Sequence, residues 1–243
     1  MDIKPYYDTY WSESGFNPGA DLTTSLRTLL ETHVPPGARC LDVGCGNGST
    51  AGPWLVRRGC GYVGVDVSET AVRQAVALGL DARLVEDAVA LPFEDGAFDV
   101  ALAVEVLEHL FAPHLAVAEI LRVLRPGGVL VATVPNVSYW RRRLDLAALG
   151  RWNPFGDDLS VEQPWRDPHI RFFNPSSLRR MLLAAGFQQV AVEGQGGAVL
   201  RDLPLTRRLW RGRPSPLYAV AERCLPSLLG LRVGSVAVKA PAG

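Results

Sequence analysis

The sequence predicts an α/β protein in which a parallel sheet is covered by helices on both faces. From residue 39 to residue 135, short apolar runs alternate with segments of helical spacing, which is typical of strand–helix–strand units. The apolar runs are continuous, so both faces of each strand are expected to be buried. A glycine-rich turn follows the first run, at the edge of the sheet where such folds bind their ligands.

Local signals place each element. Strands are expected at residues 40–43, 62–66, 82–86, 98–104, 129–135, 188–193 and 233–239. Helices are expected at residues 22–32, 49–58, 69–78, 114–124 and 175–185. Asp21 and Ser68 are the predicted N-caps of the first and third helices, because their side chains can accept hydrogen bonds from the first helical amides. Gly79 and Gly186 are predicted to end two of the helices.

We expect one domain over residues 1–243, with three additions to the sheet. Residues 1–36 form an N-terminal cap, and its first part is rich in aromatic residues. This part is expected either to fold over the ligand cleft or to dock on the protein's own core. Residues 137–172, after the fifth strand, are expected to form a lid or insert on the substrate side, and residues 197–231 a second insert.

Charge and composition restrict the possible functions. The 25 Lys and Arg residues balance the 25 Asp and Glu residues, so a nucleic-acid backbone is not expected as the main partner. The four cysteines form no Cys-x-x-Cys pair and are expected to be reduced thiols. Residues 1–5 do not resemble the start of a signal peptide, and there is no run of about 18 apolar residues. We therefore expect a cytoplasmic protein.

The turn after the first strand carries the strongest functional signal. Residues 41–49 read LDVGCGNGS, which places Gly44, Gly46 and Gly48 at alternate positions and Asp42 just before them. Glycine is needed where the backbone turns sharply or touches a ligand. A dinucleotide site has its third glycine one residue later and binds a pyrophosphate, which the carboxylate of Asp42 would repel. A carboxylate in this place instead favours a cationic ligand, such as an ammonium or a sulfonium.

This segment resembles motif I of the class I S-adenosylmethionine-dependent methyltransferases, and the resemblance extends over about residues 38–192. It implies S-adenosylmethionine as cofactor and methyl transfer as activity. It also implies a Rossmann-like sheet of seven strands in which the last strand is antiparallel and inserts between the fifth and sixth. The glycine spacing and Asp42 argue against the alternative of a dehydrogenase.

Further cofactor contacts are expected at the ends of the next three strands. Asp66 ends the second strand, 22 residues after Gly44, where an acid accepts from ribose hydroxyls. After the third strand, the resemblance implies that Asp87 accepts from the adenine amino group and that the backbone N–H of Ala88 meets the ring, with Glu86 as the alternative acid. Val67 is expected on the adenine face. The backbone at residues 104–105, Val104 and Glu105, is expected beside the methionine half of the cofactor.

A cluster of acids and histidines follows the fourth strand. Glu105, Glu108 and His109 have three- and four-residue spacing, which places side chains on one face of a helical turn. Two crowded carboxylates repel each other unless a cation or proton lies between them. The Glu-x-x-Glu-His pattern resembles that of ubiquinone-biosynthesis O-methyltransferases and small-RNA 2′-O-methyltransferases, which use it for a metal. In the RNA group a further histidine follows the fifth strand, and His169 matches its position.

The resemblance therefore implies a divalent ion such as Mg²⁺ held by Glu105, Glu108, His109 and His169, without implying an RNA substrate. Two alternatives remain: His109 or His169 acts as a general base without metal, or the cluster is structural. We expect O-methylation of a small hydroxylated metabolite, such as a natural product or sugar, in secondary metabolism. The alternatives are a membrane-surface methyltransferase of a prenylated phenol, for which the aromatic and arginine-rich insert could contact lipid, and a non-catalytic cofactor-binding accessory protein.

Overall fold

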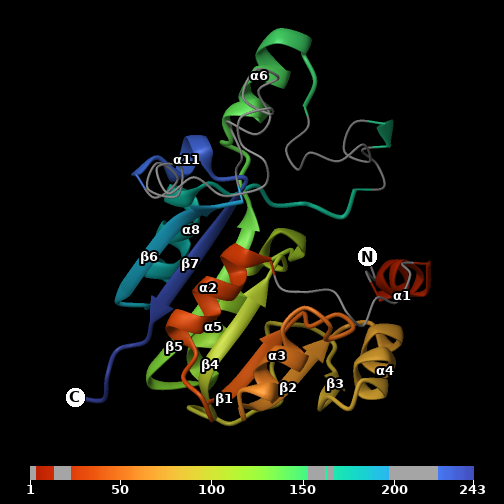
Figure 1. Ribbon diagram of the computed structural model, residues 1–243, viewed down its shortest axis with the longest axis vertical. Coiled ribbons are helices and arrows are strands. Elements are labelled where there is room, and N and C mark those ends of the chain that lie inside the picture. The colour runs from red at the N-terminus through yellow and green to blue at the C-terminus, as the bar shows by residue number, and fades with distance from the viewer. Residues whose placement is uncertain (1–3, 14–22, 153–161, 164–166, 197–223) are drawn as a thin grey trace.

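The computed structural model describes residues 4–13, 23–152, 162–163, 167–196 and 224–243, and its centre is one seven-stranded sheet (Figure 1). The strand order is β3-β2-β1-β4-β5-β7-β6. The strands are β1 (Arg39–Val43), β2 (Gly61–Asp66), β3 (Ala82–Leu84), β4 (Phe98–Val104), β5 (Leu124–Pro135), β6 (Gln189–Gln195) and β7 (Arg232–Val238). Strands β1 to β5 are parallel, whereas β7 is antiparallel to both β5 and β6. The predicted Rossmann-like methyltransferase sheet is thus confirmed.

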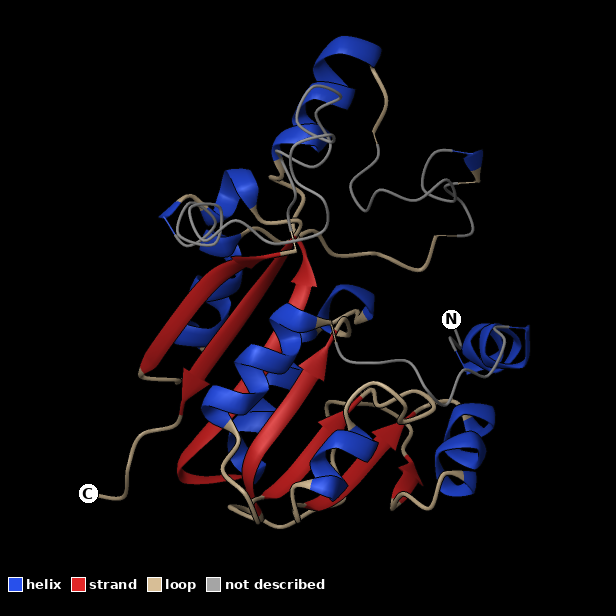
Figure 2. Cartoon of the chain, viewed as in Figure 1, coloured by secondary structure: helices blue, strands red, loops and turns tan. Residues whose placement is uncertain are grey.

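Helices cover both faces of this sheet (Figure 2). One face packs against α2 (Thr24–His33), α3 (Gly52–Arg57) and α4 (Glu69–Ala77), and the other against α5 (Pro113–Val123) and α8 (Pro175–Ala184). Neighbouring residues of one strand point to opposite faces of the sheet. In β1, Cys40 packs on the face covered by α2, α3 and α4, whereas Leu41 packs on the face covered by α5 and α8. Burial on both faces explains why the strands read as continuous apolar runs.

Several predicted boundaries differ from the observed ones. Helix α2 is capped by Thr23, whose side chain accepts from the amide of Leu26; the predicted cap, Asp21, lies outside the described residues. Helix α3 begins at Gly52 and not at residue 49, because the chain is still in the glycine turn. Strand β3 ends at Leu84, two residues early. Ser68 caps α4 as predicted, accepting from the amide of Ala71.

The three additions contain helices where they are described. Helix α1 (Lys4–Glu13) belongs to the N-terminal cap, and α6 (Trp140–Leu149) belongs to the insert after β5 and rises away from the sheet (Figure 1). Residues 197–223 of the second insert lie outside the described residues, and α11 (Pro226–Leu229) precedes β7. Over the described parts of the chain, none of the helices combines the length and the apolar character needed to cross a membrane.

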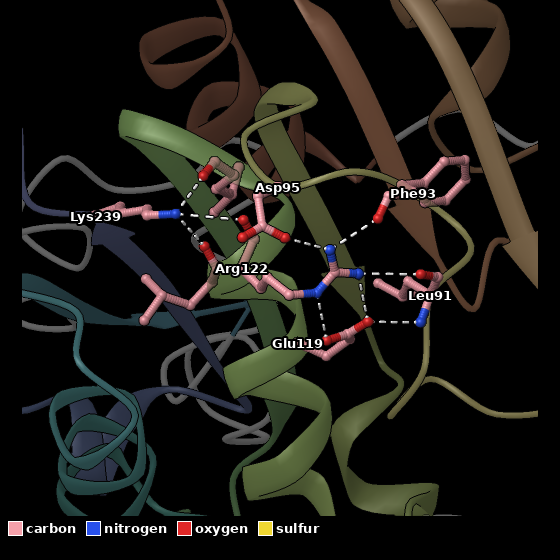
Figure 3. A network of polar contacts seen from close by, with 8 residues as sticks. Leu91, Phe93, Asp95, Glu119, Arg122 and Lys239 are labelled. Atoms are coloured by element: carbon pink, nitrogen blue, oxygen red, sulfur yellow. Dashed lines mark hydrogen bonds and ion pairs between the residues drawn. The ribbon is translucent and has the colours of Figure 1, made fainter. Parts of the chain in front are cut away.

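A polar network fixes the connection between β3 and β4 against α5 (Figure 3). Arg122 donates to the side chains of Glu119 and Asp95 and to the carbonyls of Leu91 and Phe93. Glu119 in turn accepts from the amide of Leu91, and the guanidinium of Arg122 lowers the pKa of Glu119. The network thereby anchors the segment that follows residues 86–89, which form part of the cavity described next.

Candidate active site

A cavity of about 540 Å³ lies at the carboxyl ends of the parallel strands. Its wall comes from the residues after β1, β2, β3 and β4, from aromatic side chains of α1, and from the segment around His169. Ligand sites of ordinary size have about 300–1,000 Å³. The volume therefore suits a nucleoside-sized cofactor together with a small acceptor, in the position expected for this type of sheet.

The glycine turn has the backbone that only glycine adopts easily. Gly44, Gly46 and Gly48 have φ values of 66°, 54° and 72°. The amides of Gly44 and Cys45 donate to the carbonyl of Val65, which fixes the turn against the end of β2. Of the three glycines, Gly44 lines the cavity. A side chain at Gly48 would clash with Leu80, so this glycine serves packing within the fold.

Asp66 is held rigidly at the cavity wall. It is buried, and its two carboxylate oxygens accept from the amide of Gly46 at 2.8 Å and the amide of Ser68 at 2.9 Å. Burial raises the pKa of Asp66, and these hydrogen bonds oppose the shift. A carboxylate can accept about four hydrogen bonds, so capacity remains for ribose hydroxyls. Val67 also lines the cavity.

The segment after β3, for which contacts to adenine are predicted, lies at the cavity wall. Glu86, Asp87 and Ala88 all line the cavity. Asp87 is exposed and accepts from the amide of Val89 at 3.2 Å, which makes a tight turn. Glu86 is exposed at the wall too, so the choice between the two acids as the adenine contact stays open.

Four predicted contacts do not lie on the wall that the described residues form: Asp42, Gly46, Gly48 and Val104. Asp42 is buried below the turn and accepts from the hydroxyl of Tyr62 at 3.0 Å. Burial raises its pKa to about 7. A direct contact between Asp42 and the cofactor stays a prediction, and in this geometry its charge acts through the turn. Glu105 does line the cavity.

His109 and His169 line the other end of the cavity, and the buried Glu108, which does not line it, lies next to them. Each offers a ligand atom, and these atoms lie within 4.8 Å of one another. Glu108 is fully buried, and among the described residues neither of its carboxylate oxygens has a hydrogen-bond partner. Burial, and then the charge of Glu105, raise the pKa of Glu108 well above its usual range. Hydrogen bonds from the amides of Ile170 and Arg171 to the Glu108 carbonyl hold the His169 segment in place.

Both imidazoles are oriented by their Nδ1 atoms. His109 Nδ1 lies 3.3 Å from the carbonyl of Pro168, which can only accept, so this nitrogen carries the proton in the hydrogen-bonded tautomer. His109 Nε2 then faces Glu108 at 3.9 Å. His169 Nδ1 lies 2.6 Å from the carboxylate of Asp167. Burial, and then the neighbouring His169, lower the pKa of His109 to about 4. Such carboxylate- and carbonyl-supported imidazoles are typical of metal ligands.

Glu105 differs from the prediction that it shares a helical face with Glu108 and His109. The short 3-10 helix covers Leu107–His109, and Glu105 precedes it with a φ of 55°. Its carboxylate accepts from Thr133 at 2.9 Å and pairs with Arg232 at 3.2 Å. The backbone leaves β4 too sharply to continue as one helix. Glu105 therefore lies outside the three-residue cluster, and its predicted role as a metal ligand remains a prediction.

The sequence left one contributor to this site open and missed another. Tyr7 and Trp11 of α1 line the cavity, which agrees with one of the two roles expected for the aromatic N-terminal segment. Asp167 was overlooked as the partner of His169, and its place two residues earlier could have indicated it.

Comparisons with known proteins agree with this geometry. Residues 41–132 match the family described as a methyltransferase domain. The chain is 30% identical over 198 residues to a ubiquinone biosynthesis O-methyltransferase of Idiomarina loihiensis, and the match covers 76% of this chain and 77% of that protein. It is 33% identical over 132 residues to a 2-methyl-6-phytyl-1,4-hydroquinone methyltransferase of Synechocystis sp., covering 49% of this chain and 42% of the relative's length.

A solved structure of an S-adenosylmethionine-dependent methyltransferase from Archaeoglobus fulgidus has a TM-score of 0.63 at 18% identity, covering 96% of this chain and 100% of that one. This likeness concerns the fold. Fold and cavity together define an α/β protein with a ligand-sized cavity at the carboxyl ends of its parallel strands. With the similarity to the Idiomarina protein, the chain belongs to the class I S-adenosylmethionine-dependent methyltransferases.

Proposed function

We propose that this protein transfers a methyl group from S-adenosylmethionine to a hydroxyl oxygen of a small molecule, which is held at the Glu108–His109–His169 cluster. The observation that carries the proposal is the buried carboxylate of Glu108, which faces His109 and His169 and accepts no hydrogen bond within the described part of the chain. A buried carboxyl group, ionised or protonated, is costly unless it has a hydrogen-bond or ionic partner. A divalent ion or a bound hydroxyl at this place would supply it.

The residues of the cavity divide the work of the reaction. Asp66 and the segment Glu86–Ala88 would hold the nucleoside part of the cofactor, and the backbone near Glu105 would lie beside its methionine half. The sulfonium methyl is already reactive, and catalysis then depends mainly on bringing the acceptor oxygen into line with it. His109 and His169 lie where they can hold the acceptor or its proton.

A divalent ion fits the donor set. Glu108, His109 and His169 would hold it, and when bound it would lower the pKa of a coordinated hydroxyl. Two imidazoles with one carboxylate favour ions of intermediate softness such as Zn²⁺ or Fe²⁺, whereas participation of Glu105 would favour Mg²⁺. Without metal, His169 is the better general base, because its Nδ1 is supported by Asp167, whereas the pKa of His109 is lowered to about 4.

A prenylated phenol is the acceptor that the surface favours over a sugar. Helix α6 has no buried residue, and apolar side chains on it and nearby are exposed: Leu144, Leu146, Leu149, Trp152 and Phe172. An exposed apolar group of this kind suits contact with a lipid chain or surface. The Idiomarina and Synechocystis relatives carry names that refer to ubiquinone and to a phytyl hydroquinone.

The test has two stages. Calorimetry with S-adenosylhomocysteine first measures whether the cofactor site is functional. Methyl transfer from labelled S-adenosylmethionine is then measured for a prenylated dihydroxybenzene and for a sugar, after EDTA and after addition of Mg²⁺, Mn²⁺ or Zn²⁺. We expect transfer to the phenol, loss with EDTA and recovery with metal. Cofactor binding without transfer to either acceptor would contradict the proposal. If EDTA does not reduce methyl transfer, the reaction needs no metal, and a histidine acts as general base instead.

A further inference from the structure

Helix α1 is attached next to the cofactor site by specific polar contacts. The carboxylate of Asp8 accepts from the hydroxyl of Ser68 at 2.6 Å and from the amide of Thr70 at 3.2 Å. The side chain of Gln74 donates to the carbonyl of Trp11 at 3.0 Å. Since Ser68 follows Asp66 by two residues, these contacts fix α1 against the first turn of α4, directly beside the carboxylate that is expected to bind ribose (Figure 1).

Trp11 lies on the glycine turn. A Cβ atom placed on Gly46 would collide with the six-membered ring of Trp11, so the turn and the indole are in close contact. Trp11 also lines the cavity, together with Tyr6, Tyr7 and Tyr10. Because the cavity keeps about 540 Å³ while α1 is docked, the helix closes over the ligand space and does not fill it.

Tyr7 carries the most specific signal on α1. Its hydroxyl oxygen is shielded from solvent, and within the described residues it has no hydrogen-bond partner. Its ring lies edge-on to the ring of His109, with the ring centres 6.0 Å apart. Burial, and then neighbouring groups that include Asp66 and Glu108, raise the pKa of this hydroxyl well above its usual range, so it stays protonated and can donate a hydrogen bond. A shielded hydroxyl without a partner destabilises the protein, which indicates that a ligand completes it.

We propose that Tyr7 and Trp11 are cofactor-binding residues: Trp11 packs on the methionine half of S-adenosylmethionine above the glycine turn, and the Tyr7 hydroxyl hydrogen-bonds to the same ligand. The proposal rests on the proposed function, because it requires that this cavity binds the methyl donor. In this proposal, α1 contributes to cofactor affinity in addition to the residues at the ends of the strands. Since no residue of α1 is buried by the protein itself, contacts with the ligand should also stabilise the docked helix.

The experiment measures binding of S-adenosylhomocysteine by calorimetry to the full-length wild type, Trp11→Ala, Tyr7→Phe and Ser12→Ala. Ser12 is exposed on the same helix and outside the cavity wall, and its hydroxyl donates only to the carbonyl of Thr9 among the contacts seen. We expect about tenfold weaker binding for Trp11→Ala, about fivefold for Tyr7→Phe, and wild-type affinity for Ser12→Ala. Asp8→Ala, which detaches the helix, should weaken binding, and it should reduce the additional effect of Tyr7→Phe.

Hydrogen exchange of the α1 amides, measured with and without S-adenosylhomocysteine, provides the second readout. We expect slower exchange in the complex of the wild type and a smaller change in Trp11→Ala. Wild-type affinity in both Trp11→Ala and Tyr7→Phe, with unchanged α1 exchange, would overturn the assignment while leaving the proposed function intact. If the wild type itself binds no S-adenosylhomocysteine, the proposed function and this inference both fail.

Discussion

Asp66 and Glu108, the buried carboxylates near the two ends of the cavity, differ in their hydrogen-bond partners. At the cofactor end, Asp66 accepts from the amides of Gly46 and Ser68, so the fold itself satisfies it. At the acceptor end, Glu108 is buried more completely, yet within the described residues its carboxylate accepts nothing. The carboxylate of Asp66 is therefore satisfied by the fold alone, and its end of the cavity is here called the complete end, whereas the carboxylate of Glu108 needs a ligand or ion as its partner.

This difference indicates that one of the two carboxylates serves the stability of the fold and the other serves function. A hydrogen-bonded carboxylate such as Asp66 orders the turn and the strand end around it. A buried carboxylate without a donor opposes folding, because removal from water is not compensated. Retention of such a group indicates a use that outweighs the cost, and the imidazoles of His109 and His169 beside Glu108 are consistent with ligand or metal binding.

The largest expected effect comes from Glu108→Met, which replaces the carboxylate by an apolar side chain of similar length. Methyl transfer should fall by about a thousandfold, since metal assistance is worth several kcal/mol. The metal-free protein should nevertheless become more stable, by about 1–3 kcal/mol. Activity assays and urea unfolding after EDTA treatment measure the two effects.

Glu105→Gln is the matched control for stability. Its carboxylate has donors in Thr133 and Arg232, so this substitution should reduce stability where Glu108→Met raises it. A less stable but still active Glu108→Met protein would show that the two carboxylates do not differ in the way described.

The next effect concerns the complete end of the cavity. Asp66→Ala should weaken binding of S-adenosylhomocysteine about a hundredfold, because hydrogen bonds from two ribose hydroxyls to a carboxylate would be lost. Asp87→Ala should change affinity only a few-fold, since this carboxylate is exposed. Calorimetry gives both values, and Asp66→Asn, which keeps one acceptor oxygen, should fall between them. If Asp87→Ala weakened binding more than Asp66→Ala, the main contact with the cofactor would lie after β3.

A smaller effect is the pH dependence that His109 imposes. Its pKa falls from 6.5 to about 4 in the folded protein. Between these pH values the unfolded chain binds the proton and the folded one does not, so stability decreases as pH falls through this window. The contribution is on the order of 3 kcal/mol over the full window. In urea unfolding at pH 4.5–7 with EDTA, His109→Gln should flatten the slope, whereas His114→Gln, at an exposed position of α5, should keep it.

The sequence predicts the complete end of the cavity better than the other parts of the site. Asp66 follows from local signals, namely an apolar strand that ends in an acid at a known distance from a glycine turn. The meeting of Glu108 and His109 with His169 was anticipated only through the resemblance. The exclusion of Glu105 depends on a sharp backbone turn and on Arg232 from β7, which a helical spacing rule cannot show.

The contributions of α1 could not be placed from the sequence, because they depend on contacts between residues that lie far apart in the chain. Asp8 meets Ser68 and Trp11 meets Gly46 only after α1 docks on α4. The aromatic composition indicated a covering segment, but it left open whether Tyr7 would face a ligand or the core. Helix α6 could not be predicted from the sequence either. It has no buried face, so its apolar residues do not form the stripe by which an amphipathic helix is recognised.

The smallest expected effect concerns Asp42, which lies close to the complete end but behind its wall. Asp42→Asn should weaken binding of S-adenosylmethionine only a few-fold, because a charge behind the glycine turn contributes about 1 kcal/mol at this range. Burial raises the pKa of Asp42 from 3.8 to about 7. The folded protein therefore holds a proton that the unfolded chain has lost between these pH values, and stability contributed by this group decreases as pH rises through that window.

A cationic cofactor should favour the ionised form of Asp42 and so release a proton on binding near pH 7. Calorimetry in two buffers with different ionisation enthalpies measures this release, which Asp42→Asn should abolish while Asn47→Ala, in the same turn, retains it. A loss of affinity in Asp42→Asn as large as that in Asp66→Ala would mean that the turn opens on binding and brings Asp42 to the ligand. The cofactor end would then be rearranged by its ligand, and the contrast with the Glu108 end would no longer hold.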